Sequence, residues 1–142
     1  MNSFITREND YAIRICAYLA GNYDRGPIPL SEISRKLFIT RAFAHKIVHR
    51  LKHNKIIETV QGKHGGIYLK KHPARLSIYD ILRAMGFNST MNECVVKPQV
   101  CPLVTGCKIH LFFMDLEEYL LSQLKARKII EFSITDEVLS LG

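Results

Sequence analysis

Two short helical patterns, joined by an almost absent connection, constrain the fold of this chain more than any other feature. Ser31 is predicted to cap the first helix and Thr40 the second. The apolar positions that face inward in the two helices are Ile33, Leu37, Ala44, Ile47, Val48 and Leu51. Two short helices around a tight Phe38-Ile39 connection indicate a helix-turn-helix; a stacked helical hairpin without a ligand is the alternative.

A β-hairpin pattern follows the second helix directly. Residues 56–60 are rich in β-branched side chains, residues 61–66 form a glycine-rich turn, and residues 67–70 read as the returning strand. A hairpin in this place is the wing of a winged helix. Its glycines do not have the spacing of a dinucleotide or phosphate-binding loop, so nucleotide binding is not expected.

Helical patterns flank this unit. Thr6 caps a predicted helix to about residue 20, on whose apolar stripe Cys16 is expected to be a buried structural thiol. Ser77 and Asp80 resemble a capping box, and a short helix follows. A last helical turn is expected near Ser133. A long helix over about 108–127 has its apolar positions at Ile109, Phe112, Phe113, Leu116, Tyr119, Leu120 and Leu124.

That apolar stripe is wide for a final helix, so we expect the long helix to pair with a copy of itself, the alternative being burial against its own domain. The predicted class is mainly α with a small β-wing: a winged helix-turn-helix plus a long dimerisation helix. The predicted divisions are a DNA-binding domain over 1–87, a cysteine loop over 88–107, and the long helix with the C-terminal tail over 108–142.

Charge is segregated along the chain. The net charge is +7, but residues 1–87 contain 15 Lys and Arg against 6 Asp and Glu, while residues 88–142 contain 5 against 7. Residues 35–75 contain 11 basic residues and a single acidic one, Glu58. A basic segment of this kind indicates a polyanionic partner, the alternative being a solvated basic face.

The second helix of the predicted helix-turn-helix carries residues suited to reading duplex DNA. Arg and Lys reach phosphates or guanine edges, and Phe43 or Ala42 can contact a thymine methyl group. The predicted DNA contacts are Thr40, Arg41, Phe43, His45, Lys46, His49 and Arg50 on this helix, and Lys63 and His64 on the wing. His45, His49 and His53 also have the spacing of a helical metal pair, but no nearby carboxylate or thiol completes such a site.

Three cysteines, Cys94, Cys101 and Cys107, lie within fourteen residues. A loop can wrap three thiolates around an iron–sulfur cluster, and Cys107 stands where a helix N-terminus would stabilise a bound anion. His110 lies one turn further and is a candidate fourth ligand. Zinc is an alternative, although the tight cysteine pair of structural zinc sites is missing. A redox-active thiol pair is the other alternative.

Over nearly its whole length the chain resembles the bacterial Rrf-type winged-helix transcription regulators, in particular the IscR-like and NsrR-like iron–sulfur regulators. Residues 9–14 resemble the opening helix of the family and residues 29–34 its positioning helix. Residues 61–69 resemble the wing, and residues 76–81 the helix after it. The cysteine loop and the long helix follow in the order of the family.

The resemblance implies a homodimer that binds a palindromic DNA operator and holds one 2Fe–2S or 4Fe–4S cluster per subunit, whose loss, oxidation or nitrosylation changes DNA affinity. The sequence itself shows no membrane span and no secretory signal, so a cytoplasmic protein is expected. Cys94, Cys101 and Cys107 would be the thiolate ligands. The fourth ligand would be His110, as in IscR-like members, or Asp10 from the partner subunit, as in NsrR-like members. Repression is the expected mode of regulation.

Three departures from the family pattern stand out. The gap between the first two cysteines is six residues instead of five, Phe38 replaces a glycine in the turn, and Gln61 replaces an arginine in the wing. The last change removes the arginine of the family's wing, and Lys63 or His64 is expected to contact the minor groove in its place.

Other classes of protein fit the sequence less well. The sequence has no apparent nucleophile–base pair or paired carboxylates, so an enzyme is not expected. Without a run of about 18 uncharged apolar residues, no membrane span is expected, and the charged N-terminus does not resemble a secretory signal. The alternative function is a thiol-based or cluster-free regulator that acts through a protein partner.

Overall fold

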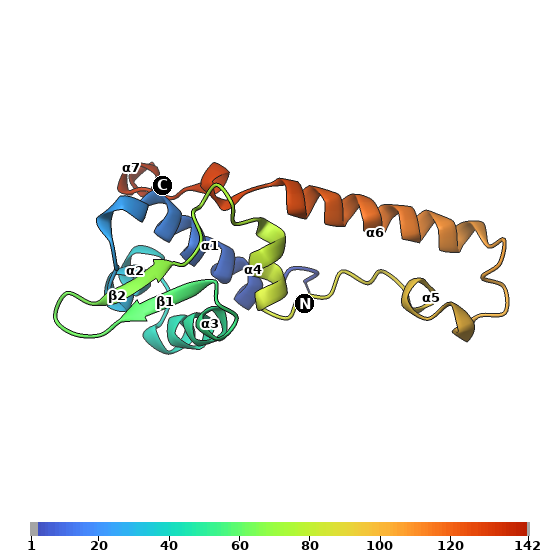
Figure 1. Cartoon of the computed structure of the whole chain (residues 1–142), viewed down its shortest axis with the longest axis horizontal. Coiled ribbons are helices and arrows are strands. Elements are labelled where there is room, and N and C mark those ends of the chain that lie inside the picture. The colour runs from blue at the N-terminus through green and yellow to red at the C-terminus, as the bar shows by residue number, and fades with distance from the viewer. Residues whose placement is uncertain (1–2, 142) are drawn as a thin grey trace.

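The computed structural model describes residues 3–141, and it places a winged-helix body at one end of a long projecting helix (Figure 1). The helices and strands in chain order are α1 (Arg7–Gly21), α2 (Leu30–Lys36), α3 (Arg41–His53), β1 (Ile57–Val60), β2 (Gly66–Leu69), α4 (Ile78–Ala84), α5 (Glu93–Val96), α6 (Lys108–Ala126) and α7 (Asp136–Ser140). Short 3₁₀ helices lie at Tyr23–Arg25, Pro98–Val100 and Ile129–Phe132. The predicted class, mainly α with a small β-wing, is confirmed.

Local capping explains most of the helix starts. The side chains of Thr6 and Thr40 accept hydrogen bonds from the backbone of Asn9 and Phe43, as predicted for α1 and α3. Ser77 and Asp80 form the predicted capping box of α4. The predicted cap of α2 was wrong: the helix begins at Leu30 after Pro29, whose φ of −60° and ψ of 142° already set the extended conformation of a cap.

The wing is a two-stranded antiparallel hairpin that is tied to the body by a third segment. Ile57 pairs with Leu69 and Val60 with Gly66, and the backbone of Ile28 exchanges two hydrogen bonds with Ile67. A Cβ atom on Gly66 would come within 2.3 Å of the Ile28 backbone, so only glycine allows this close approach. The wing is therefore held at a fixed position beside α3.

The core lies between α1, α2, α3, α4 and the inner face of the hairpin. Its fully buried side chains include Ile15, Ile33, Ile47, Leu51 and Leu82. Cys16 is completely buried among them, as predicted, and burial raises the pKa of its thiol. The most deeply buried part of α3 is therefore the predicted apolar stripe, which fixes the helix with its opposite side toward solvent.

The C-terminal tail returns to the body, as the red end of the ribbon shows (Figure 1). Ile129 is fully buried, and its backbone N–H donates to Leu76. The N–H of Ile134 donates to Ala17 at 2.9 Å, and a Cβ atom on Gly21 would clash with the Ile134 backbone. The tail after α6 thus packs against α1, and α7 begins with the Thr135 cap.

The turn between α2 and α3 stores backbone strain. Phe38 has a φ of +55°, and 90 % of its side chain is exposed. A residue with a Cβ atom in this left-handed conformation costs roughly 1–2 kcal/mol, and Phe38 gains little burial in return. The glycine that the family pattern has at this position fits the observed conformation.

We expect Phe38→Gly to raise the free energy of unfolding by about 1 kcal/mol, because glycine adopts this conformation without strain. Urea unfolding at a fixed protein concentration measures the change. Phe38→Ala is the matched control: it removes the ring but keeps a Cβ atom, so its stability should stay near that of the natural chain. Equal stability of the glycine and alanine variants would contradict the strain interpretation.

Candidate nucleic-acid interface and cysteine segment

An ion-pair cluster sets the orientation of α2. Arg25 binds both carboxylate oxygens of Glu32 at 2.8 and 2.9 Å, and the Tyr18 hydroxyl donates to the same carboxylate at 2.6 Å. The Arg25 guanidinium holds the pKa of Glu32 at about 2. The cluster therefore stays charged at neutral pH and ties α2 to α1.

The turn into α3 is closed by hydrogen bonds from α2. The Ser34 hydroxyl donates to the carbonyl oxygen of Ile39, and the Ile39 N–H donates to the carbonyl oxygen of Ser34 at 3.1 Å. Thr40 then caps α3, so the first turn of α3 is fixed relative to α2.

The surface of α3 has a free side. The exposed residues of this side are Arg41, Ala42, His45, His49 and His53, and no ion pair or side-chain hydrogen bond joins them to other described residues. Lys63 and His64 are exposed at the tip of the wing, where Gly62 has a φ of +104°. The predicted contacts Arg41, His45, His49, Lys63 and His64 are thus open to a ligand.

Other predicted contacts on α3 lie toward α1. The Phe43 ring packs edge-on against Tyr11 with centroids 5.7 Å apart. Lys46 Nζ binds Glu8 Oε1 at 2.7 Å, and Arg50 lies 3.8 Å from the other oxygen. The sequence pattern could not show this, because Glu8 lies 38 residues before Lys46.

Lys52 is a cation near this interface that is not among the contacts predicted from the sequence. Lys52 Nζ donates to Thr59 Oγ1 at 2.7 Å and lies 3.7 Å from Glu58, so it bridges α3 and β1. Lys52 lies two helical turns after His45, and this spacing could have indicated that the two residues share a side of α3. Glu58 also lies 3.9 Å from Lys70, and a hydrogen bond from the Thr59 backbone helps to lower its pKa. The single acid of the basic segment is therefore neutralised locally.

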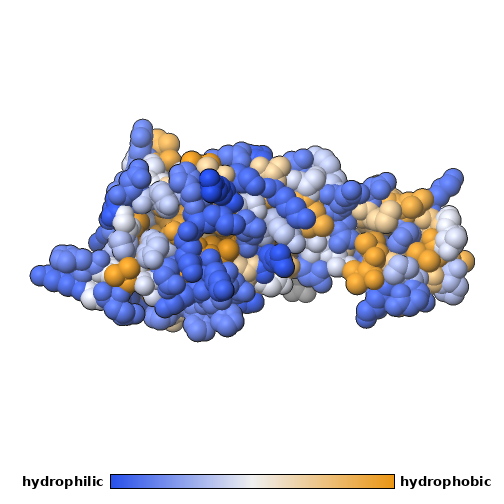
Figure 2. All heavy atoms as spheres, viewed as in Figure 1, coloured by the Kyte–Doolittle hydropathy of each residue, from blue (hydrophilic) through white to orange (hydrophobic). Residues whose placement is uncertain are grey.

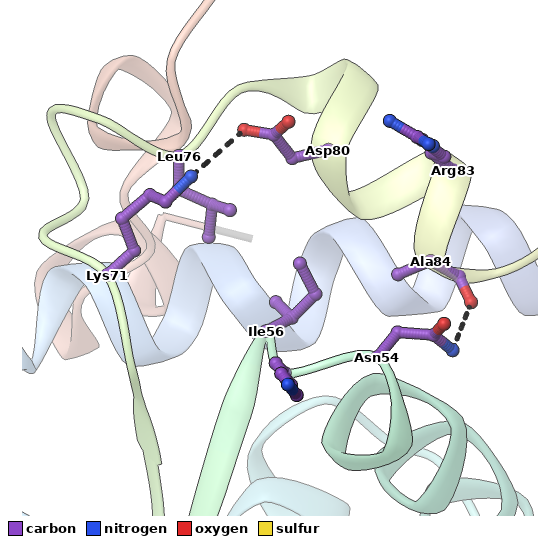
Figure 3. A pocket seen from close by; sticks show the side chains of 8 residues that line it. Asn54, Ile56, Lys71, Leu76, Asp80, Arg83 and Ala84 are labelled. Atoms are coloured by element: carbon purple, nitrogen blue, oxygen red, sulfur yellow. Dashed lines mark hydrogen bonds and ion pairs between the residues drawn. The ribbon is translucent and has the colours of Figure 1, made fainter.

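The C-terminal end of α3 is anchored to α4 beside a pocket of about 380 Å³ (Figure 3). The side-chain amide of Asn54 donates to the carbonyl oxygens of Arg50 and Ala84, each at 2.9 Å. Lys71 lies 3.9 Å from Asp80 across the pocket. These contacts couple the position of α3 to the helix that follows the wing.

The cysteine segment lies at the far end of α6 from the body (Figure 1). Cys94 is on α5, Cys101 follows the 3₁₀ helix Pro98–Val100, and Cys107 is the N-cap of α6. His110 Nδ1 lies 3.3 Å from Cys94 Sγ, and the backbone N–H of His110 donates to Cys107 Sγ at 3.5 Å. The structure therefore places the Cys94 thiol at the His110 ring and the Cys107 thiol at the backbone N–H of the same residue.

The remaining candidate ligands lie apart from this contact. Cys101 is half-buried and makes no side-chain hydrogen bond within residues 3–141. Asp10 is on α1, where it pairs with Arg14 at 2.9 Å. Among the described residues, 3–141, no three His, Cys, Asp or Glu side chains are close enough together to hold a metal ion. By donor chemistry, three partly exposed thiols and an imidazole fit an iron–sulfur cluster, and its binding would require the loop to close so that these side chains come together.

The long helix leaves its apolar stripe uncovered. Ile109, Phe112 and Tyr119 are 67 %, 60 % and 63 % exposed, and none of the described residues of α6 is buried. Figure 2 shows apolar patches at this end of the molecule, in contrast to the mostly hydrophilic body. The predicted alternative, burial of the stripe against its own domain, is therefore wrong for most of the helix. Among residues 3–141, no helix is both long and apolar enough to cross a membrane.

The chain is similar to known proteins over nearly its whole length. A family model described as "Rrf2: Iron-dependent Transcriptional regulator" matches residues 5–132. Protein aau3 of Rhizobium meliloti is 30 % identical over 90 % of this chain and 89 % of its own. The transcriptional regulator IscR of Xenorhabdus nematophila is 26 % identical over 97 % of this chain and 84 % of its own. The structure of CymR, the global cysteine regulator of B. subtilis, superposes with a TM-score of 0.72 at 17 % identity, over 100 % of this chain and 99 % of the other.

Proposed function

Because the chain belongs to the Rrf2 family of transcriptional regulators, and is therefore a DNA-binding regulator and not an enzyme, we propose that it represses transcription as a homodimer and senses its signal through an iron–sulfur cluster. The signal would be redox state, nitric oxide or iron–sulfur status. The proposed parts are a DNA-binding domain over 1–87, a sensing loop over 88–107, and a dimerisation helix with the tail over 108–142.

The DNA contacts are assigned to the free side of α3 and to the wing. Thr40, Arg41, His45 and His49 would face the major groove of a half-site, and Lys63 with His64 would hold the adjacent backbone. The exposure of these residues supports the assignment. Phe43 and Arg50 contact α1, so their effect on DNA would come from positioning α3. Lys46 is mostly exposed and can exchange Glu8 for a phosphate.

We expect Arg41→Gln to weaken DNA binding about tenfold, because an arginine contact to a phosphate or guanine contributes about 1–3 kcal/mol. The measurement is fluorescence anisotropy with an operator selected from random duplex DNA, at constant salt. Arg35→Gln on α2 removes the same charge from an exposed position outside the predicted contacts, so it should change affinity less than twofold. Unchanged affinity of Arg41→Gln would refute the assignment of α3.

The observation that carries the cluster assignment is the contact of the His110 ring with Cys94 at the first turn of α6, which the Cys107 sulfur caps. A loop closure that brings Cys101 and Cys107 to this contact gives three thiolates and one imidazole. The positive end of the α6 dipole would stabilise an anionic cluster there. When bound, such a cluster supplies one-electron redox chemistry and reactivity toward oxygen and nitric oxide. The protein side chains hold it and connect it to the helix that pairs the subunits.

We assign the fourth position to His110, because it already lies beside Cys94, whereas Asp10 is paired with Arg14 on α1. The test is the anaerobic absorption spectrum of His110→Ala and Asp10→Asn. His110→Ala should shift the visible bands and shorten the lifetime of the cluster in air, while Asp10→Asn should match the natural chain. The reverse pattern would assign the position to Asp10 of a second subunit.

A thiol sensor without a cluster is the second candidate. The Cys94 thiol lies against the His110 ring, and the overall likeness to CymR, named a global cysteine regulator, also supports this candidate. In that case Cys94 and Cys107 would suffice and iron would be absent from the active protein. Such a regulator could act through a protein partner.

A further inference from the structure

A cleft of about 510 Å³ lies where the first turn of α1 meets α3 and the end of α4. Its volume is within the range of small-molecule binding sites in proteins. One wall is the side of α3 that carries Phe43 and Arg50, and the opposite wall begins with Thr6 and continues through Asn9. The cysteine segment contributes none of the residues that line it.

Asn9 is a largely enclosed polar residue in the wall of this cleft. The residue is only 6 % exposed. Its backbone N–H donates to Thr6 Oγ1, but its side-chain amide makes no hydrogen bond to any described residue from 3 to 141. Its amide atoms are not fully buried, so they reach solvent and can bind a group that enters the cleft.

The charged residues of the cleft favour an anion. Arg7 and Arg50 both line it; the guanidinium of Arg7 lies over the Phe43 ring at 5.4 Å and forms no ion pair with an acid among residues 3–141. Glu8 is the single acid in the lining, and Lys46 and Arg50 already neutralise it. Guanidinium groups match the geometry of carboxylate and phosphate groups. Phe43 and Met85 add apolar surface beside them.

The pocket of Figure 3 lacks this combination. The Asn54 amide there already donates to two carbonyl oxygens, and Lys71 already faces Asp80. The cleft beside α1 is therefore the better candidate for a ligand site.

We infer that the cleft between α1, α3 and α4 binds a small organic anion, whose carboxylate or phosphate group pairs with Arg50 and Arg7 and whose polar groups satisfy the Asn9 amide. Such a ligand would lie directly against the helix assigned to DNA. The ligand would compete with Glu8 for Arg50 and so change the contact between α3 and α1. A ligand at this place would therefore act as an effector of DNA binding.

The test is an NMR titration of the full chain with benzoate and with inorganic phosphate, at constant ionic strength and without DNA. The side-chain amide signals of Asn9 and the Nε–H signal of Arg50 should shift and saturate at millimolar concentrations with at least one anion. Saturation with benzoate alone identifies a carboxylate site with an apolar wall, and saturation with phosphate alone identifies a phosphate site. No saturable shift with either anion would overturn the inference.

Variants separate this site from general attraction to a basic protein. Asn9→Leu and Arg50→Gln should each raise the dissociation constant by on the order of tenfold. Asn9→Leu should keep a cooperative melting transition, which shows that the variant is folded. Lys52→Gln removes a positive charge from the same helix outside the cleft and should bind like the natural chain. Unchanged anion binding by Asn9→Leu and Arg50→Gln would refute the site. That result would leave the assignment of α3 to DNA binding untouched.

Discussion

Phe112→Asp is expected to convert the proposed homodimer into monomers and to weaken operator binding by about 100-fold or more. The side chain is 60 % exposed on the uncovered stripe of α6, and it would be buried against a second copy of the helix. An unpaired carboxylate in that interface carries a large desolvation cost. A monomer also loses the second half-site, which two linked DNA-binding domains bind at a high effective concentration.

Sedimentation and anisotropy measure the two effects on one preparation. Ser122→Asp adds the same charge on the polar side of α6 and should leave both the mass and the affinity unchanged. Because the α6 stripe contributes little to the described core, Phe112→Asp should keep a folded body with a melting transition. A variant that remains dimeric would exclude the stripe as the interface.

Cys101→Ala is expected to remove nearly all iron from the anaerobically prepared protein and to abolish regulation by oxygen or nitric oxide. A cluster requires closure of the whole loop, whereas a redox pair of Cys94 and Cys107 would tolerate this change. The variant therefore distinguishes the two candidate functions. Iron and acid-labile sulfide, measured with the visible spectrum, give the result.

Cys16→Ala is the matched control, because it removes a thiol that is completely buried in the core. It should keep the iron and lose on the order of 1 kcal/mol of stability through the small cavity that it leaves. A Cys101→Ala protein that retains iron and still responds to oxygen would contradict a three-thiolate site. Loss of iron from Cys16→Ala would show that the loop alone does not hold it.

Local signals in the sequence predicted the elements that depend on neighbouring residues. Thr40 caps α3 because its side chain reaches a backbone N–H three residues on, and the Ser77–Asp80 capping box works in the same way. The buried stripe of α3 follows from helical period alone. The left-handed turn at Phe38 was visible only as a departure from the family pattern, since nothing in a phenylalanine itself favours a positive φ.

Contacts between distant segments could not be predicted in this way. The pairing of Lys46 with Glu8, and of Ile134 with Ala17, joins residues far apart in sequence. Such contacts decide which basic residues of α3 are free and where the tail packs. The cysteine spacing indicated a site, but the contact of Cys94 with the His110 ring needed the packing of α5 against α6.

The most direct test of the account is one anaerobic preparation of the natural chain, assayed for iron, sulfide, visible absorption and operator affinity before and after exposure to oxygen and nitric oxide. The account predicts stoichiometric iron and sulfide, visible charge-transfer bands, and an operator affinity that changes by at least about tenfold when those bands are lost. Protein without iron or sulfide, whose operator affinity is the same before and after exposure, would contradict it.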